Sequence, residues 1–466
     1  MRVKRVLQRS LVFGSSHLKV TREYYQKYEA INEILLANSE VLDVFHRALS
    51  RAWGGSVRRR RSRFTSEQLL RAILVMELEG LPYRDTVIRI DDSEFLRRFV
   101  GIPHGPVMDY STLSKVYKAL GPKTWKSINM CLGQYALAEE YIEGSHLRVD
   151  TTAYETNIRY PADSRLLWDG YRVLARWLER VREYDPEAVG SGRLQRRRVK
   201  RLANQIGRQA SQRAACRERL KRPYRALLGH VECILAWSRE VALRCEERVE
   251  RDEYQLEMLP LISRLLMEHR YFAPRIAQVI WQARRRVLAG QAVPNAEKIF
   301  SLFESHTELL KRGKAGKPIE FGHMILLHQV EHKFITDYEV FAKRPSDNSL
   351  VGDILDRHRK LWGELPEAFA ADKGFYESME QLRSLEKKIP HVSIAKKGHR
   401  TWAESEREHD PVFRTLQRFR AGIEGTISYL KRCFKLDRCL YRSFRTYCSS
   451  VGSHIFAHNL LVLSRL

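Results

Sequence analysis

Three charged residues in the segment 418–432, RFRAGIEGTISYLKR, have types and spacing that suit phosphate or metal chemistry. Glu424 lies four residues after Arg420 and seven before Lys431. Each residue of a helix turns by about 100°, so a helix here would place these side chains in one strip beside an apolar face. A carboxylate in that strip could bind a metal ion or a proton, although many helices carry such charges only for solubility. The apolar face would consist of Phe419, Ile423, Ile427, Leu430 and Phe434.

Two aspartates could complete a site with Glu424. Residues 146–151 alternate polar and apolar side chains like a strand, with Asp150 near its expected end, and Asp372 ends the short apolar segment AFAAD. If these strands are neighbours and the helix packs beside them, three carboxylates converge. Hard oxygen ligands suit Mg²⁺ or Mn²⁺, and a pair of such ions can promote phosphoryl transfer. Each aspartate alone could be a turn former or an N-cap. Four other acids could complete the site instead: Glu155, Asp163, Asp337 and Asp347.

The surrounding pattern predicts the elements that must position these residues. Residues up to about 145 read as helices, with a capping-box pattern at Thr65 and Gln68 and a later cap at Ser111 or Thr112. Such short helices with basic surfaces suit a helix-turn-helix fold or, equally, a packing or dimerisation module. After the first strand come helical spacing at 166–288, a strand pair at 319–331 and 333–342, a helix at 351–362, the strand of Asp372, a helix at 376–387, a strand at 391–397 and the helix of Glu424.

The charge of the chain predicts a polyanionic partner. The formal net charge is +26, from 82 Lys and Arg against 56 Asp and Glu, which favours nucleic acid first and an anionic membrane surface second. The stretch 193–222 holds twelve basic residues and a single acid, Glu218. A helix with such a face would follow a phosphate backbone, and a merely solvated helix is the alternative. The candidate DNA contacts are Arg196, Arg197, Arg198, Lys200 and Arg201.

Other features bear on the location of the protein. The uncharged window 446–464 contains two histidines, an asparagine and several serines, which predicts a packed C-terminal helix rather than a membrane span. The N-terminal residues lack the pattern of a signal peptide, so we expect no export. Seven cysteines without a CxxC pair indicate buried thiols in a reducing cytoplasm.

At the three acidic segments the sequence resembles the DDE transposases of bacterial insertion sequences. RVDTTAYETNIRYPADSRLLWD resembles the block of the first Asp, AADKGFYE that of the second, and RFRAGIEGTISYLKR that of the Glu. The signature of the Glu block is Tyr-x2-Arg-x3-Glu-x6-Lys. Arg420, Glu424 and Lys431 match it, whereas Gln417 stands at the Tyr position. The resemblance covers about 64–160 and 298–462, and the long insertion is most similar to the ISNCY-type group.

The resemblance implies a fold and a division of the chain. The expected fold is an α/β RNase H-like catalytic core with a mixed five-stranded sheet, a helical N-terminal domain, and a long helical insertion between the first and second strands. The corresponding ranges are 1–140 for a helix-turn-helix-like DNA-binding domain, 141–163 with 298–466 for the catalytic domain, and 164–297 for the arginine-rich insertion.

The resemblance also implies an activity. A water activated by Mg²⁺ or Mn²⁺ would cut at the ends of the element, and the freed 3′-OH would attack target DNA. Asp150, Asp372 and Glu424 would hold two ions per active site, with Arg420 and Lys431 binding phosphates. The implied partners are terminal repeats, target DNA and a second copy of the chain on paired ends, at the nucleoid in the bacterial cytoplasm. A non-catalytic DNA-binding relic and a nuclease that does not join strands are the alternatives.

Overall fold

The computed structural model describes residues 4, 17–53, 63–209, 214–311 and 317–466. The chain forms two compact units. The first contains residues 1–157 and 323–466, and the second contains residues 158–322. The predicted insertion, 164–297, falls within the second unit, whose bounds are wider on both sides. The helices at the N-terminal end of the chain share the first unit with the sheet.

A mixed sheet of seven strands has the order β2-β3-β1-β5-β6, with β4 beside β3 and β7 beside β1. β1 is parallel to β5 and β7, β5 is parallel to β6, and β3 is antiparallel to β2 and β4. The prediction of five strands missed β2 and β7, which are too short to show an alternating pattern. The strands are β1 (His146–Thr156), β2 (Glu308–Lys311), β3 (Ile319–Gln329), β4 (Ile335–Val340), β5 (Ala368–Ala371), β6 (His391–Ile394) and β7 (Arg438–Cys439).

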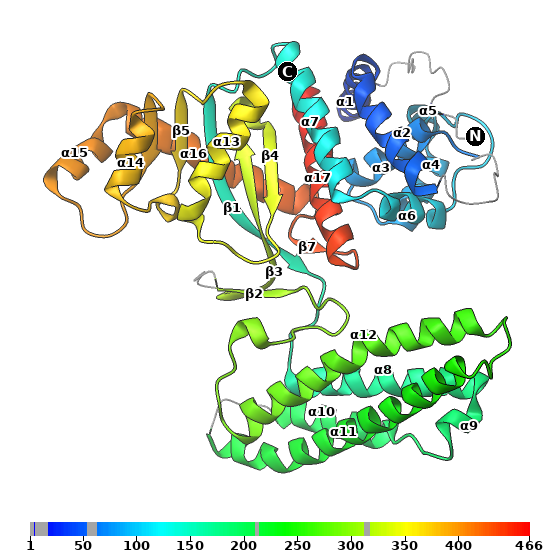
Figure 1. The fold of residues 1–466 in the computed structure, drawn as a ribbon. Coiled ribbons are helices and arrows are strands. Elements are labelled where there is room, and N and C mark those ends of the chain that lie inside the picture. The colour runs from blue at the N-terminus through cyan, green and yellow to red at the C-terminus, as the bar shows by residue number, and fades with distance from the viewer. Residues whose placement is uncertain (1–3, 5–16, 54–62, 210–213, 312–316) are drawn as a thin grey trace. The chain divides into compact units, whose positions relative to one another are not determined.

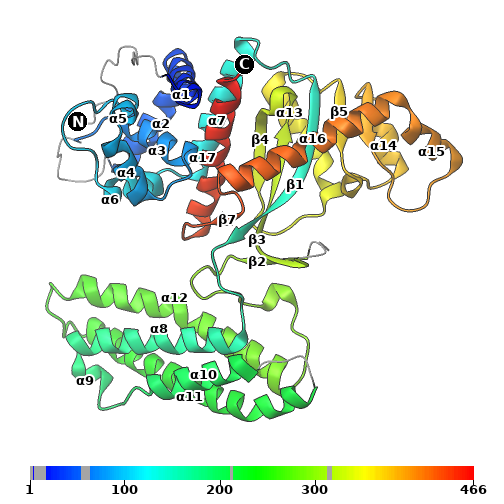
Figure 2. The ribbon, with the colours of Figure 1, turned by 180° about the vertical axis from the view of Figure 1, so that it is seen from behind.

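Helices of the first unit cover both faces of its sheet. α16 (Pro411–Cys433) packs on β1, β5 and β6, and crosses one face in Figure 2. α13 (Val351–Trp362) lies over the other face in Figure 1. The buried face of α16 includes Ile423 and Leu430, as expected, while Phe419 and Ile427 are half-buried. Two shorter helices, α14 (Met379–Glu386) and α15 (Trp402–His409), pack against β6 and α16 respectively.

The helices before β1 share one hydrophobic core with the sheet and with α17 (Phe444–Leu463), the predicted packed C-terminal helix. The capping box at Thr65 and Gln68 is present. A later helix, α6, begins at Tyr110 and is capped by Asp109, whose Oδ1 accepts a hydrogen bond from the Ser111 N–H at 2.8 Å. The predicted cap at Ser111 or Thr112 is therefore wrong. These helices are α1 (Lys19–Ala37), α2 (Ser39–Trp53), α3 (Ser66–Leu78), α4 (Tyr83–Asp92), α5 (Glu94–Val100), α6 (Tyr110–Ala119) and α7 (Pro122–Ala138).

The second unit is mainly a helical bundle with its own core, in which Trp177 donates from Nε1 to the Leu265 carbonyl at 2.7 Å. Its basic stretch, 193–222, includes residues 210–213, which lie outside the described residues. The helices are α8 (Asp163–Tyr184), α9 (Pro186–Val189), α10 (Arg196–Gln209), α11 (Ala214–Glu250) and α12 (Leu259–Ala283).

Among the helices in the described ranges, none is both long and apolar enough to cross a membrane. Cys131, Cys245 and Cys439 are buried, whereas Cys233 and Cys433 are exposed. The predicted burial of the thiols is therefore wrong for the last two. Both lie on solvent-exposed sides of helices, where a small side chain loses no core contacts.

Candidate active site

Asp150 lies in the middle of β1 rather than near its end. The strand continues to Thr156 because Glu155 and Thr156 pair with Arg438 and Cys439 of β7. Asp150 is half-buried, and its Oδ1 accepts a hydrogen bond from the Thr151 N–H at 2.7 Å. The pairing with a distant segment therefore corrects the predicted position of the aspartate in its strand.

Asp372 directly follows β5, the parallel neighbour of β1. His146 pairs with Ala368 and Arg148 with Ala370, so continuing this register by two residues sets Asp150 level with Asp372. Asp372 caps the following turn, and its Oδ1 accepts from the Gly374 N–H at 2.7 Å. The sheet thus places two carboxylates from distant parts of the sequence on adjacent strands.

A third carboxylate, Asp347, lies at the same end of the sheet. The Thr151 hydroxyl donates to Asp347 Oδ1 at 3.5 Å. A Cβ at Gly374 would lie 2.8 Å from Asp372 Oδ1 and 3.3 Å from Asp347 Oδ2, so these two oxygens flank one small space that only glycine leaves open. Asp347 was one of the four other acids that could have completed the site. It is far from Asp150 in sequence, and no local pattern marks it as a neighbour of Asp150 and Asp372.

The other three rival acids are engaged elsewhere. Glu155 pairs with Arg438 at 3.8 Å. Asp163 pairs with Arg286 at 2.8 Å inside the second unit. Asp337 is buried in β4, where Lys126 and Arg357 contact it. Burial raises its pKa, but the nearby Lys126 and His328 outweigh this effect and lower the pKa overall.

Glu424 is linked to Asp150 by Arg420. Arg420 Nη2 lies 3.1 Å from Glu424 Oε1, and Nη1 lies 3.9 Å from Asp150 Oδ2. The side chain of Glu424 is 63% exposed, whereas those of Arg420 and Asp150 are 18% and 17% exposed. A single guanidinium thus contacts two acids that are distant in sequence and reduces the repulsion between them. Lys431 is half-buried near the C-terminal end of the same helix.

Buried polar contacts hold α16 against β1. Arg148 donates from Nε to Gln329 Oε1 at 2.7 Å and from Nη1 to the Phe419 carbonyl, and its guanidinium lies 4.4 Å from the centre of the Phe419 ring. Burial lowers the pKa of Arg148 to about 10. The Thr426 hydroxyl donates to Gln329 Oε1 at 3.3 Å. A side chain at Gly422 would collide with Arg148, so glycine allows this close approach of helix and strand.

Residues 303–460 match the family model of the transposase DDE domain. The match supports a DDE-type transposase of insertion sequences. The matched range contains Asp372 and Glu424, whereas Asp150 precedes it. No curated protein and no solved structure matches the chain.

In this DDE domain, Gln417 occupies the position of the signature tyrosine and faces the strands. Its Nε2 donates to the Ser393 carbonyl at 2.9 Å and to the Ser393 hydroxyl at 3.0 Å, and lies 3.4 Å from the Ala371 carbonyl. Ala371 directly precedes Asp372. Gln417 therefore ties the helix of Glu424 to the strand that presents Asp372.

The donor set of this candidate site has the right chemistry for a hard divalent cation, since Asp150, Asp347 and Asp372 all offer carboxylate oxygens. Within the described ranges, however, no group of three or more His, Cys, Asp or Glu side chains is arranged to hold a metal ion. The guanidinium of Arg420 contacts one carboxylate oxygen of Asp150 and one of Glu424, where a metal ion would otherwise bind. Binding of one ion by Asp150, Asp372 and Glu424 together would require their side chains to reorient.

The predicted DNA-contacting residues begin α10 of the second unit. Val199, Ala203 and Ile206 form the buried face of this helix. Arg197, Arg198, Lys200 and Arg201 are exposed, whereas Arg196 pairs with Glu179 of α8 at 2.6 Å. Four cations within five residues of α10 are thus exposed to solvent, whereas Arg196 has a structural partner within the unit.

Proposed function

We propose that the chain is a transposase that cuts phosphodiester bonds at the ends of a DNA element and joins the freed 3′ ends to target DNA. The observation that carries this proposal is the register of the parallel strands β1 and β5, which sets Asp150 level with Asp372. Asp372 lies within the residues that match the transposase DDE domain. Arg420 contacts both Asp150 and Glu424, which supports the inclusion of Glu424 in the same site.

Asp150, Asp372 and Glu424 would hold two Mg²⁺ or Mn²⁺ ions, and Asp347 is positioned to add a fourth carboxylate. Bound ions would supply activation of the attacking oxygen and stabilisation of the leaving oxygen. Arg420 keeps the acids together in the metal-free state. Arg420 would also be placed to bind a substrate phosphate, with Lys431 farther along the helix.

The remaining parts of the proposal follow from charge and from family likeness. The exposed cations of α10 would hold DNA through its phosphates. We propose the ISNCY-type group, the three ranges 1–140, 141–163 with 298–466, and 164–297 as functional domains, and a homodimer on paired ends that acts at the bacterial nucleoid. The bulk of the positive charge then serves two DNA substrates, the element ends and the target.

The decisive experiment compares Asp372→Asn with the wild type on labelled DNA ends. The asparagine side-chain oxygen can still accept from the Gly374 N–H, so the turn is retained. We expect cleavage in Mg²⁺ or Mn²⁺ to fall by more than about a hundredfold, because a change in a residue that only orients a metal ligand already costs about 10–100-fold. DNA binding should remain at the wild-type level.

Asp356→Asn on the exposed face of α13 is the matched control and should cut normally. Cleavage by Asp372→Asn at the wild-type rate would remove Asp372 from the site. Wild-type protein that cuts without joining strands would be a nuclease, and protein that binds DNA without metal-dependent nicking would be a non-catalytic relic.

A further inference from the structure

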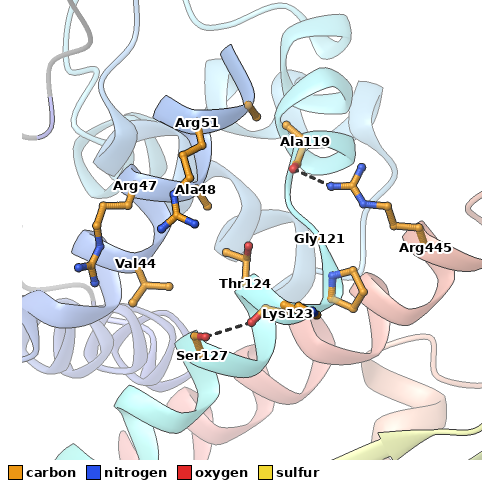
Figure 3. A pocket seen from close by; sticks show the side chains of 12 residues that line it. Val44, Arg47, Ala48, Arg51, Ala119, Gly121, Lys123, Thr124, Ser127 and Arg445 are labelled. Atoms are coloured by element: carbon orange, nitrogen blue, oxygen red, sulfur yellow. Dashed lines mark hydrogen bonds between the residues drawn. The ribbon is translucent and has the colours of Figure 1, made fainter. Parts of the chain in front are cut away.

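An open hollow in the first unit is lined by cations from three elements that are far apart in sequence. Its volume is about 850 Å³. Arg47 and Arg51 come from α2, Lys123 from the start of α7, and Arg445 from the start of α17 (Figure 3). No acidic residue is among the described residues that line it. The hollow therefore has a strongly positive potential that attracts anions.

The tertiary structure fixes part of this cation cluster. Arg445 donates from Nη2 to the Ala119 carbonyl at 3.2 Å, which is drawn in Figure 3, and from Nη1 to the Lys118 carbonyl at 3.5 Å. A Cβ at Gly121 would lie 3.2 Å from Arg445 Nη2, so the glycine leaves room for the guanidinium beside the turn. Arg445 is thus anchored, while Arg47 and Arg51 are exposed and remain available to a ligand.

The start of α7 adds to the positive field. The helix begins at Pro122 with Gly121 as its N-cap, and its first turn contains no acidic residue. The N-terminal end of a helix carries partial positive charge, which favours phosphate groups. The hydroxyl of Thr124 faces the hollow in Figure 3 and can donate to an anion.

The uncharged residues that line the hollow indicate which kind of polyanion fits it. The other described lining residues are small or aliphatic, such as Val44, Ala48 and Pro122, and no aromatic side chain is among them. Single-stranded nucleic acid is usually held by stacking of its bases on aromatic rings, which this surface lacks. Cations without a stacking platform suit the backbone of a duplex, whose phosphates are contacted independently of sequence.

We propose that the hollow lined by Arg47, Arg51, Lys123 and Arg445 binds backbone phosphates of duplex DNA. The inference rests on the proposed function for its choice of partner. It names a specific contact surface for the same DNA substrate: Arg47, Arg51 and Lys123 lie in the range 1–140 that was expected to bind DNA, and Arg445 joins them from the other end of the sequence. The contact joins α2, α7 and α17, so DNA bound there would engage both ends of the polypeptide in one unit.

The test uses the full chain with Arg47→Ala and Arg51→Ala combined, and leaves the anchored Arg445 intact. Binding to a labelled duplex is measured in EDTA over a series of NaCl concentrations. We expect the Kd to rise roughly tenfold, since each lost contact is a charge-assisted bond. The slope of log Kd against log salt should fall by about two, close to one per lost phosphate contact.

The control combines Arg359→Ala and Lys360→Ala, two exposed cations of α13 that remove the same charge from the same unit. It should change neither the affinity nor the slope. The proposal would be overturned if both double variants lost the same affinity for the duplex, or if the Arg47 and Arg51 variant kept the wild-type affinity. Weaker binding by that variant with an unchanged salt slope would also overturn it.

Cleavage assays separate this inference from the proposed function. If wild-type protein cuts DNA but the hollow variant binds duplex normally, the hollow inference fails and the transposase proposal stands. If the hollow variant binds weakly as expected but wild-type protein never cuts in Mg²⁺ or Mn²⁺, the transposase proposal fails and the DNA-binding surface stands.

Discussion

The carboxylate site of the first unit and the basic face of α10 in the second unit hold their charges in different ways. Asp150, Asp372 and Arg420 are half-buried and bonded to backbone or to each other. Arg197 and Lys200 are exposed on the outer side of a helix whose other face is buried. A reaction at one phosphorus atom requires fixed distances, whereas attraction of a uniform polyanion requires only charge density. The two regions are therefore expected to respond differently to the same kind of substitution.

The largest expected effect separates catalysis from binding. Asp150→Asn should reduce metal-dependent cleavage by more than about a hundredfold while leaving DNA affinity unchanged. Replacing Arg197, Arg198, Lys200 and Arg201 together by alanine should do the reverse. For this four-residue variant the slope of log Kd against log salt should fall by about four. Its single-turnover cleavage at saturating DNA should stay near the wild-type rate. Anisotropy titrations and cleavage kinetics on both variants provide the measurement.

Arg196→Ala is the internal control for the basic face, because Arg196 is already paired with Glu179. It should leave the salt slope as in the wild type. A loss of catalysis at saturating DNA in the four-residue variant would mean that α10 takes part in positioning the substrate, and the contrast between the two regions would not hold.

The next effect concerns stability. Arg148→Met should destabilise the first unit by about 3 kcal/mol, since it leaves Gln329 Oε1 and the buried side of the Phe419 carbonyl without their guanidinium donor. Arg197→Met, the matched change on the exposed face of α10, should cost less than about 0.5 kcal/mol. Urea unfolding followed by hydrogen exchange of peptides from each unit gives both values. Similar losses in the two variants would contradict the difference in how the two regions hold their charges.

The smallest effect is a difference in acid sensitivity. Burial lowers the pKa of His328, His358 and His458 in the first unit, and of His269 in the second, to about 4. The unfolded chain takes up protons near pH 6.5, so stability is complete above that pH and is lost as the pH falls from 6.5 towards 4. Between pH 7.5 and 6 each histidine should cost about 0.8 kcal/mol.

The first unit, with three such histidines, should therefore lose about 2 kcal/mol over this interval, and the second less than half of that. Hydrogen exchange of peptides from each unit at the two pH values provides the measurement. Replacing His328 by Gln should reduce the acid sensitivity of the first unit. Equal acid sensitivity in both units would show that the buried histidines do not control it.

The sequence was sufficient to predict most elements because their signals are local. The helix of Glu424, the strand pair β3 and β4 and the helix 351–362 are periodic over enough residues to be recognised. Two strands were missed because they are short, and β7 (Arg438–Cys439) forms only through pairing with β1. The position of Asp150 in its strand was wrong for the same reason, since β7 extends β1 beyond the alternating segment.

What the sequence alone determined is the inventory of chemistry: three acidic blocks in order, a helix carrying Arg420, Glu424 and Lys431, and a large positive charge. What only the tertiary structure decided is which groups meet. The register of β1 and β5 sets Asp150 level with Asp372, Thr151 and Gly374 place Asp347 beside them, and Arg148 fixes α16 over the strands. These contacts join residues separated by long stretches of chain, and no local pattern encodes a distance that depends on the packing of the whole unit.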